Sequence, residues 1–322
     1  MYDLVVIGGG PAGLTATIYG IRKRLDVLLV TRDLGGKTNY QLHLPFVHEH
    51  QLVRGIEIVD KFRRELEYLD FARSMDGVTR VEKTDGGFLL HTKEGKDLTA
   101  RAVIIATGTR GLRLDIPGEQ EFMMRGLCYS AISYSQFFID RTVAVVGDGE
   151  LALRAAAELA TVAAHVYLVG HLNSAVETPL GRKLQGSGNV TLLDGYRPAE
   201  VLGGQYAERL RVLTPNGSEE MLETDGIFME QALSPRSELV ADLVELDAQG
   251  RIKVDARCRT SVPGIFAAGD VTDVYAEQAL VALGEGAKAA LSAYEYLLPG
   301  LSTANAGTAT AREQSDGAKV AG

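Results

Sequence analysis

Residues 8–13 read Gly-Gly-Gly-Pro-Ala-Gly, and the architecture of the chain can be worked out from this turn. An apolar, β-branched run at residues 2–8 (YDLVVIG) precedes the turn, and a helical stretch at 12–24 follows it. The next apolar run is DVLLVT at 26–31. Strand, glycine turn, helix and strand in this order predict a βαβ unit with a parallel sheet.

The glycines have the G-x-G-x-x-G spacing of dinucleotide-binding loops. Gly8 makes the tight turn, Gly10 lets the backbone approach a pyrophosphate, and Gly13 lets the helix pack on the strand. The phosphates would lie at the helix N-terminus, where free N–H groups point at them. An acidic residue for the ribose is expected at the end of the second strand. The chain offers Asp33, which comes late, or the hydroxyl of Thr31.

The same order of elements returns at residues 141–169, where TVAVV leads into a second glycine loop, a helix and the strand HVYLVG. Further buried strands are predicted at 101–107 and 264–270, and a helix at 276–297. The predicted fold class is therefore α/β, with two doubly wound, Rossmann-like nucleotide-binding domains, the second inserted into the first. Residues 1–115 and 250–300 form the first domain, residues 116–249 the second, and residues 301–322 a flexible polar tail.

Composition excludes several classes of protein. The length of 322 residues suits about two domains. A net charge of −9 argues against nucleic acid or an anionic membrane as the main partner. No signal peptide and no apolar run of ~18 residues is recognised, so no membrane span is expected. Two cysteines cannot make a disulfide framework, and the cytoplasm is the expected location.

Other motifs extend this interpretation. They are Gly35-Gly36-Lys37, Ala106-Thr107-Gly108, Ile116-Pro117-Gly118-Glu119, the run TSVPGIFAAGD at 260–270, and Gln278-Ala279. Together with the first glycine loop they resemble the low-molecular-weight thioredoxin reductases, which are FAD-dependent pyridine nucleotide–disulphide oxidoreductases. The resemblance covers residues 1–300. It implies a flavin-dependent oxidoreductase that binds FAD in the first domain and forms a homodimer.

The resemblance also implies roles for single residues. Asp270 would hold the ribityl chain or a phosphate of FAD, and the helix starting near Ala276 would point its N-terminus at the flavin. A positive helix end stabilises the anionic reduced flavin. The residues expected to bind FAD are Gly8, Gly10, Pro11, Ala12, Gly13, Thr31, Asp33, Gly36, Lys37, Thr107, Gly108, Gly269, Asp270, Gln278 and Ala279.

The redox-active C-x-x-C of the family is missing. Ser130 and Ser133 stand where its two cysteines would be. A hydroxyl forms neither a disulfide nor a stable thiolate, so thioredoxin reduction through this motif is excluded. Cys128 is the remaining catalytic candidate, and a small buried structural cysteine is the more frequent alternative.

Cys258 lies between Arg257 and Arg259, which are expected to lower the pKa of its thiol. A bystander role is the alternative. Pairing of Cys258 with Cys128 stays open, because it requires Cα atoms within ~7 Å.

The second glycine loop keeps its spacing, but the residues that bind the 2′-phosphate of NADPH in the family are missing. The positions of the family's His-Arg-Arg group hold Gly170, His171 and Leu172, and two carboxylates, Asp148 and Glu150, lie in the loop. A standard NADPH site is therefore not expected. NADH, a second FAD as in diflavin-linked disulfide oxidoreductases, and no nucleotide at all remain open. The candidate residues for this second nucleotide are Gly147, Gly149, Glu150 and His171.

Two further segments have weaker signals. His43, His48 and His50 are interpreted as a solvated loop or a flavin contact, and no metal site is expected. The run KFRRELEY at 61–68 predicts an amphipathic helix. Its charged side chains are interpreted as a solvated helix face, and a docking patch for an acidic ferredoxin or another small redox protein is the alternative.

Three functions fit these observations. The first is an electron-transfer oxidoreductase that uses FAD, takes electrons from ferredoxin or another donor besides NADPH, and needs no C-x-x-C. The second is a ferredoxin–NAD(P) reductase or an NAD(P)H oxidase. The third is a non-catalytic flavin-binding module.

Overall fold

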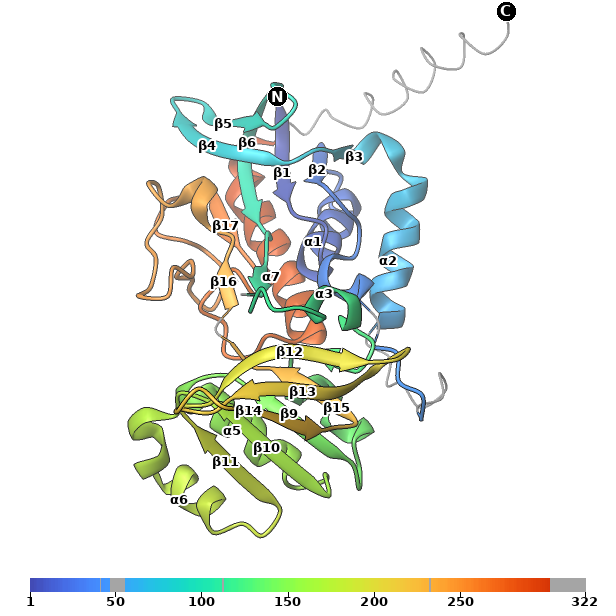
Figure 1. Ribbon diagram of the computed structural model, residues 1–322. Helices are drawn as coiled ribbons and strands as arrows, with labels where there is room; N and C mark the ends of the chain where they lie inside the picture. The colour runs from blue at the N-terminus through green and yellow to red at the C-terminus, as the bar shows by residue number, and fades with distance from the viewer. Residues whose placement is uncertain (41, 47–55, 112, 232, 302–322) are drawn as a thin grey trace, which may run out of the picture.

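A computed structural model describes residues 1–40, 42–46, 56–111, 113–231 and 233–301 of the chain. The chain forms two α/β units, the first above the second in Figure 1, and the predicted fold class is confirmed. The predicted tail lies outside the described residues, apart from Leu301. Within these five ranges, no helix is both long enough and apolar enough to cross a membrane.

The first unit is built on a seven-stranded sheet, with the order β3-β2-β1-β6-β5-β4 and β17 paired to β6. Pairs among β1, β2, β3, β6 and β17 are parallel, and β4–β5 and β5–β6 are antiparallel. The strands are β1 (Tyr2–Ile7), β2 (Val27–Thr31), β3 (Arg73–Met75), β4 (Val78–Thr84), β5 (Gly87–Thr92), β6 (Asp97–Ile105) and β17 (Ile265–Ala267). Apolar side chains of β1 and β6 are buried on both faces, as expected for central parallel strands.

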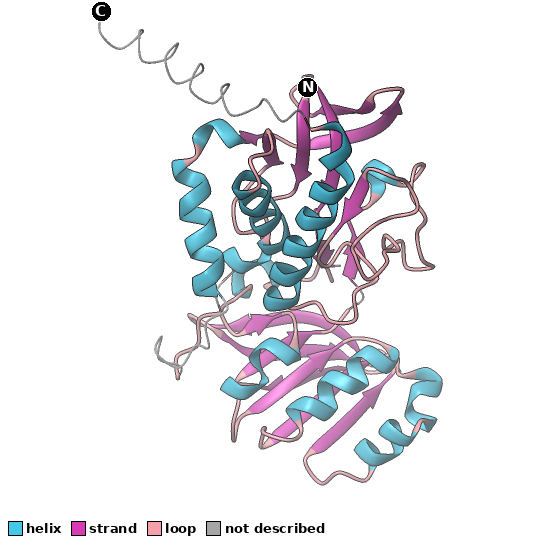
Figure 2. Cartoon of the chain, turned by 180° about the vertical axis from the view of Figure 1, so that it is seen from behind, coloured by secondary structure: helices cyan, strands magenta, loops and turns pink. Residues whose placement is uncertain are grey.

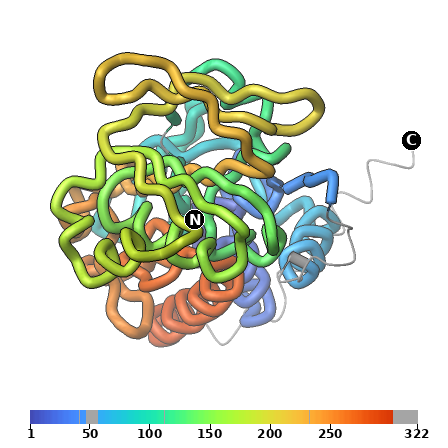
Figure 3. The backbone as a smooth tube through the Cα atoms, turned by 60° about the horizontal axis from the view of Figure 1, so that its bottom comes forward, coloured from blue at the N-terminus to red at the C-terminus, as the bar shows by residue number. Residues whose placement is uncertain are grey.

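Helices α1 (Pro11–Arg22), α2 (Ile56–Tyr68) and α7 (Ala279–Leu297) complete this unit. Figures 2 and 3 show α1 and α7 side by side on one face of the sheet. The contact is close because α7 carries Gly286, where an added Cβ would lie 2.1 Å from the carbonyl oxygen of Ala12. This packing holds the N-termini of α1 and α7 together.

The second unit contains the parallel sheet β11-β10-β9-β15-β8. Its strands are β8 (Leu127–Cys128), β9 (Thr142–Val146), β10 (His165–Gly170), β11 (Val190–Asp194) and β15 (Gly226–Met229). One face is covered by α4 (Ala131–Tyr134), α5 (Gly149–Leu159) and α6 (Pro179–Gln185). The other face packs on the antiparallel strands β12 (Arg197–Gly203), β13 (Ala207–Leu213) and β14 (Glu219–Glu223).

The chain crosses between the units twice, at two strands that pair with each other. They are β7 (Thr109–Gly111) and β16 (Leu233–Pro235), which run antiparallel. Helix α3 (Glu119–Phe122) follows β7. After β16, the apolar side chains of Leu239 and Val240 are buried against the first sheet, which removes their surface from water. The chain thus returns to the first unit at β16, earlier than the predicted boundary at residue 250.

Candidate functional site

The carboxyl ends of β1, β2, β6 and β17 lie at one edge of the first sheet, the edge that faces the second unit (Figure 1). Strand β6 runs directly into the crossing strand β7 there. The N-termini of α1 and α7 open at the same edge. In open α/β sheets, ligands bind beyond the carboxyl ends of the strands, so this edge is the candidate cofactor site.

The first glycine loop has the shape of a pyrophosphate cradle. A Cβ added at Gly8 would lie 2.3 Å from the carbonyl oxygen of Ala106. A Cβ added at Gly13 would lie 1.8 Å from the carbonyl oxygen of Gly8. At Gly10 an added Cβ would meet no atom within 4 Å. Gly8 and Gly13 are therefore needed for packing, whereas Gly10 faces the space that a pyrophosphate would fill. An FAD pyrophosphate fits this loop at the start of α1.

The two residues predicted to contact the ribose hold the turn after β2. Thr31 is buried, and its hydroxyl donates to the carbonyl oxygen of Asp33 at 2.7 Å. The carboxylate of Asp33 is exposed and accepts the N–H of Gly36 at 2.8 Å. Asp33 keeps a free carboxylate oxygen at the surface among the described contacts, whereas the hydroxyl of Thr31 is engaged. The turn itself fits because Gly36 has φ +58°.

Three charged side chains, from the turn after β2 and from the segment between β17 and α7, meet at this edge of the sheet. The ammonium group of Lys37 lies 2.9 Å from Asp270 Oδ2 and 3.4 Å from Glu277 Oε2. Burial raises the pKa of Glu277, and Lys37 opposes this shift. The predicted residues Lys37 and Asp270 are thus brought together. Glu277 was missed in the sequence, although it directly precedes Gln278-Ala279.

Three further predicted cofactor residues, Thr107, Gly108 and Gln278, lie where the chain leaves β6 and where α7 begins. Thr107 Oγ1 donates to the carbonyl oxygen of Arg236 at 2.6 Å, and the Arg236 N–H donates to the Gly108 carbonyl at 2.9 Å. Gln278 is the N-cap of α7 and makes no side-chain capping bond. The helix begins at Ala279, slightly later than predicted, and its first N–H groups face the candidate site.

The serine pair lies at the start of α4. Ser130 Oγ and Ser133 Oγ are 3.1 Å apart, so the two hydroxyls share a hydrogen bond. Ser130 has φ +79°, a left-handed conformation that is uncommon for a residue other than glycine. Two hydroxyls at this separation can bind a polar atom or pass a proton, but they cannot exchange electrons.

Glu230 was not singled out in the sequence, and it lies beside the serine pair. It follows β15, and its Oε1 accepts the N–H of Ala131 at 2.5 Å. Burial raises the pKa of Glu230 to about 7, and the nearby Glu158 and Glu277 add to the shift. Hydrogen bonds from the backbone at Ala131 and Ser130 oppose it. The site therefore holds a carboxyl group that changes protonation near neutral pH.

Both cysteines are free and buried, in different hydrophobic clusters. Burial raises the pKa of the Cys128 thiol well above its usual value, and Glu230 adds to this. This environment disfavours the thiolate that a redox role of Cys128 requires. The pKa of Cys258 is raised to about 11 by burial, so the expected lowering by its arginine neighbours is wrong. Arg257 pairs with Glu295 and Arg259 with Asp255 instead.

The segment 42–46 follows the turn after β2 and packs against the second unit. Leu42 and Leu44 lie in the same hydrophobic cluster as Cys128 and Ala131. The His43 N–H donates to the carbonyl oxygen of Met124 at 2.8 Å, and the His43 side chain is exposed. His48 and His50 lie outside the described residues. Among the residues that the structure places, no cluster of three His, Cys, Asp or Glu side chains could hold a metal ion.

The second glycine loop borders a cavity of about 250 Å³. The Asp148 carboxylate accepts the backbone N–H of His171 at 2.7 Å, and Glu150 pairs with Arg154 at 2.7 Å. Both carboxylates of the loop are thus engaged. Arg197, from β12, also lines the cavity and gives it a cation. The sequence did not predict this arginine, because its strand is far from the loop along the chain.

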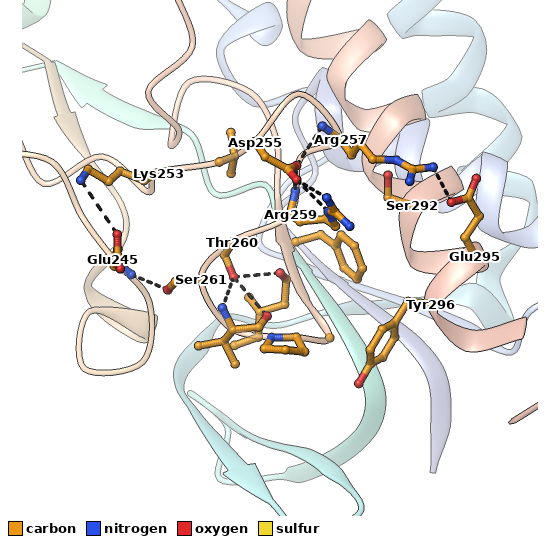
Figure 4. A pocket seen from close by; sticks show the side chains of 16 residues that line it. Glu245, Lys253, Asp255, Arg257, Arg259, Thr260, Ser261, Ser292, Glu295 and Tyr296 are labelled. Carbon is orange, nitrogen blue, oxygen red and sulfur yellow. Dashed lines mark hydrogen bonds and ion pairs between the residues drawn. The ribbon is translucent and has the colours of Figure 1, made fainter. Parts of the chain in front are cut away.

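A larger cavity of about 760 Å³ lies at the amino end of β17, away from the candidate site (Figure 4). Its charged side chains pair with each other, as Arg257 does with Glu295 and Lys253 with Glu245. Because this cavity lies at the amino end of β17, whereas the first glycine loop lies at the carboxyl ends of the strands, it is not the candidate cofactor site.

Comparisons with known proteins agree with this geometry. The profile of the pyridine nucleotide-disulphide oxidoreductase family matches residues 2–286. A subunit of the alkyl hydroperoxide reductase of Staphylococcus aureus (strain NCTC 8325 / PS 47) is 34% identical over 301 residues, which are 92% of this chain and 59% of that protein. The chain therefore spans less than two thirds of the length of this relative.

Solved structures give the same result. Thioredoxin reductase from Streptococcus pyogenes MGAS5005 superposes with a TM-score of 0.83 at 29% identity, covering 93% of this chain and 99% of that one. Thioredoxin reductase from Giardia duodenalis gives a TM-score of 0.81 at 26% identity, covering 92% and 99%. The order and packing of both units are thus those of solved oxidoreductases.

Proposed function

Because the chain belongs to the pyridine nucleotide-disulphide oxidoreductase family, we propose that it is an FAD-dependent oxidoreductase that works without a C-x-x-C dithiol. The observation that carries the proposal is the contrast between two parts of the site. The loop at 8–13 keeps open space at Gly10 for a pyrophosphate, whereas Ser130 and Ser133 face each other as hydroxyls at 3.1 Å. FAD supplies the electron chemistry when bound, and the chain supplies binding, charge and proton transfer.

The residues of the cradle have distinct tasks in this proposal. The N–H groups at the start of α1 bind the pyrophosphate, and the start of α7 stabilises negative charge on the reduced flavin. Lys37 neutralises part of the charge of Asp270 and Glu277, which would otherwise repel an anionic flavin.

We propose a small redox protein such as ferredoxin as the electron donor. The loss of the His-Arg-Arg group at 170–172 supports a donor other than NADPH. Helix α2 is amphipathic as predicted, with Val59 and Leu66 buried and Lys61 and Arg64 exposed. Arg63 on the same helix pairs with Asp60, so the basic patch on α2 is smaller than its sequence implies.

The experiment that tests this function starts with the purified full chain. The cofactor is released by denaturation, and FAD and NAD(P) are counted per chain. Anaerobic reduction of the bound flavin is then followed with reduced ferredoxin, NADH and NADPH. We expect one FAD per chain and reduction by ferredoxin but not by NADPH. A chain that binds no FAD, or that NADPH reduces at the rate of ferredoxin, would refute the proposal.

A second candidate function, a ferredoxin–NAD(P) reductase or NAD(P)H oxidase, has one observation in its favour. Arg197 gives the second cavity a cation beside the glycine loop. This is compatible with NADH, which needs no grip on a 2′-phosphate. Steady-state oxidation of NADH with a dye acceptor would favour this candidate. Two FAD per chain would instead favour a second FAD in the inserted unit.

A homodimer and a cytoplasmic location are also proposed. Ile58, Tyr68 and Phe71, on α2 and just after it, expose much of their apolar surface, which supports burial against a second copy. The two free cysteines are compatible with a reducing compartment. Light scattering of the purified chain tests the dimer.

A further inference from the structure

Glu230 is an acidic residue to which the proposed function assigns no role. It is half-buried at the carboxyl end of β15, and its Oε1 accepts the Ala131 N–H at 2.5 Å. This hydrogen bond joins two residues that are 99 positions apart in the chain. It fixes the carboxyl group beside Ser130, the first residue of the serine pair. Glu230 therefore lies next to the positions at which the sequence has lost its redox group.

The charged groups that act on Glu230 come from two other elements, and both of them are acidic. Glu158 faces it from α5 and is held by a hydrogen bond from Ser135 Oγ at 3.1 Å. Glu277, from the loop before α7, also raises the pKa of Glu230, and the neutral thiol of Cys128 lies on β8. Within the described part of the chain, no lysine or arginine forms an ion pair with Glu230. The group is thus stabilised in its protonated form.

Two connections place Glu230 on the flavin side of the second unit. Glu277, which acts on it, lies 3.4 Å from the ammonium group of Lys37, in the turn after β2. The segment 42–46, which continues from that turn, packs beside Ala131, the hydrogen-bond partner of Glu230. Glu277 and the segment 42–46 therefore link the surroundings of Glu230 to the proposed flavin site, and charges at the two places act on each other.

We propose that Glu230 is the proton carrier of the flavin site: it takes up a proton when the flavin is reduced and releases it when the flavin is reoxidised. This inference rests on the proposed FAD-dependent function. An external donor supplies two electrons, and one proton goes to the flavin ring, which leaves the reduced flavin with one negative charge. A second proton, from solvent, goes to the Glu230 carboxylate. Both protons and both electrons leave on reoxidation, so atoms and charge balance.

The physical reason is the negative charge on the reduced flavin. It disfavours a second negative charge nearby, so it raises the proton affinity of Glu230 above that in the oxidised protein. The pKa of Glu230 is already about 7, so this further rise falls in the neutral and mildly basic range. The serine hydroxyls at 130 and 133, which lie beside this carboxyl group, can both donate and accept hydrogen bonds.

The test is the midpoint potential of the flavin in the FAD-loaded full chain, measured by spectroelectrochemistry from about pH 6 to about pH 9. Each proton coupled to a two-electron reduction contributes about 30 mV per pH unit. We expect a segment of doubled slope above about pH 7 in the wild type and a single slope throughout in Glu230→Gln. Glu220→Gln, at an exposed position on β14, is the matched control and should keep the wild-type curve.

A second measurement covers the case in which Glu230→Gln does not fold. Infrared difference spectra between the reduced and oxidised protein should show a protonated carboxyl band in the wild type, and this band should shift in Glu230→Asp. Equal slopes in wild type and Glu230→Gln, or a carboxyl band that is absent from the wild type, would overturn the inference. A chain that binds no FAD would instead refute the proposed function, so the two failures are distinct.

Discussion

The substitution Gly10→Ala should separate FAD binding from folding. Gly10 has φ −72°, which alanine adopts without strain, and the added Cβ meets no protein atom within 4 Å. Alanine restricts the backbone of the unfolded chain more than glycine does, and this stabilises the folded chain by about 0.4–1 kcal/mol. The loss of glycine at the N-cap of α1 costs a similar amount. The free energy of unfolding of the FAD-free chain should therefore change by less than about 1 kcal/mol.

FAD affinity should fall strongly in the same variant, because the methyl group occupies the space where the pyrophosphate approaches the backbone. Losing one hydrogen bond to a charged group costs about 1.5–3 kcal/mol. Since about 1.4 kcal/mol is a factor of ten, the Kd for FAD should rise by about 10- to 100-fold for each bond lost. Flavin fluorescence titration gives the Kd, and urea denaturation of the FAD-free chain gives the stability.

The matched control is Gly13→Ala. There the added Cβ would lie 1.8 Å from the carbonyl oxygen of Gly8, so helix and loop must move apart. Such overpacking costs about 1–3 kcal/mol, and Gly13→Ala should be destabilised even without FAD. If Gly10→Ala binds FAD as tightly as the wild type, or is destabilised as much as Gly13→Ala, the assignment of this loop to the pyrophosphate is wrong.

Three further predictions concern the rest of the site. The double variant S130C/S133C should take up two more electrons per FAD than the wild type in an anaerobic dithionite titration, because a disulfide accepts two; an unchanged end point would show that these positions do not form the pair. The folded-state pKa of Glu230, about 7, lies above the ordinary 4.5, so the folded chain binds this proton more tightly. The stability that this bound proton gives to the folded chain is present below about pH 4.5 and is lost as the pH rises to 7. The free energy of unfolding of Glu230→Gln, measured by urea denaturation, should therefore rise by up to about 3 kcal/mol relative to the wild type across this range. A difference that does not change with pH would contradict this. Arg197→Ala should weaken NADH binding by about tenfold or more, the cost of one charged hydrogen bond, while FAD content stays constant; unchanged calorimetric binding of NADH would remove this arginine from the second site.

The sequence predicted those parts of the molecule that depend on neighbours along the chain. The turn at 8–13 could be recognised because strand, glycines and helix follow one another within a few residues. The roles of Gly8 and Gly13 in packing follow from the same local pattern. The second βαβ start at 142–170 was visible for the same reason.

The parts that the sequence did not predict come together only in the folded chain. Glu230 reaches Ala131 across 99 positions, and Arg197 reaches the second glycine loop from a separate sheet. No short spacing indicates either contact. Cys258 shows the opposite error, because the two arginines next to it in sequence point to Glu295 and Asp255. Adjacency along the chain did not determine which charges act on its thiol.

The pairing of β7 with β16 has a consequence for how such a chain is assembled. Entry to and exit from the inserted unit lie side by side, with Thr109 opposite Pro235 and Gly111 opposite Leu233. A tight turn could join the two strands in place of the entire insert and leave the first sheet with all its strands in order. Substitutions or insertions inside the second unit therefore leave the strand order of the first sheet unchanged.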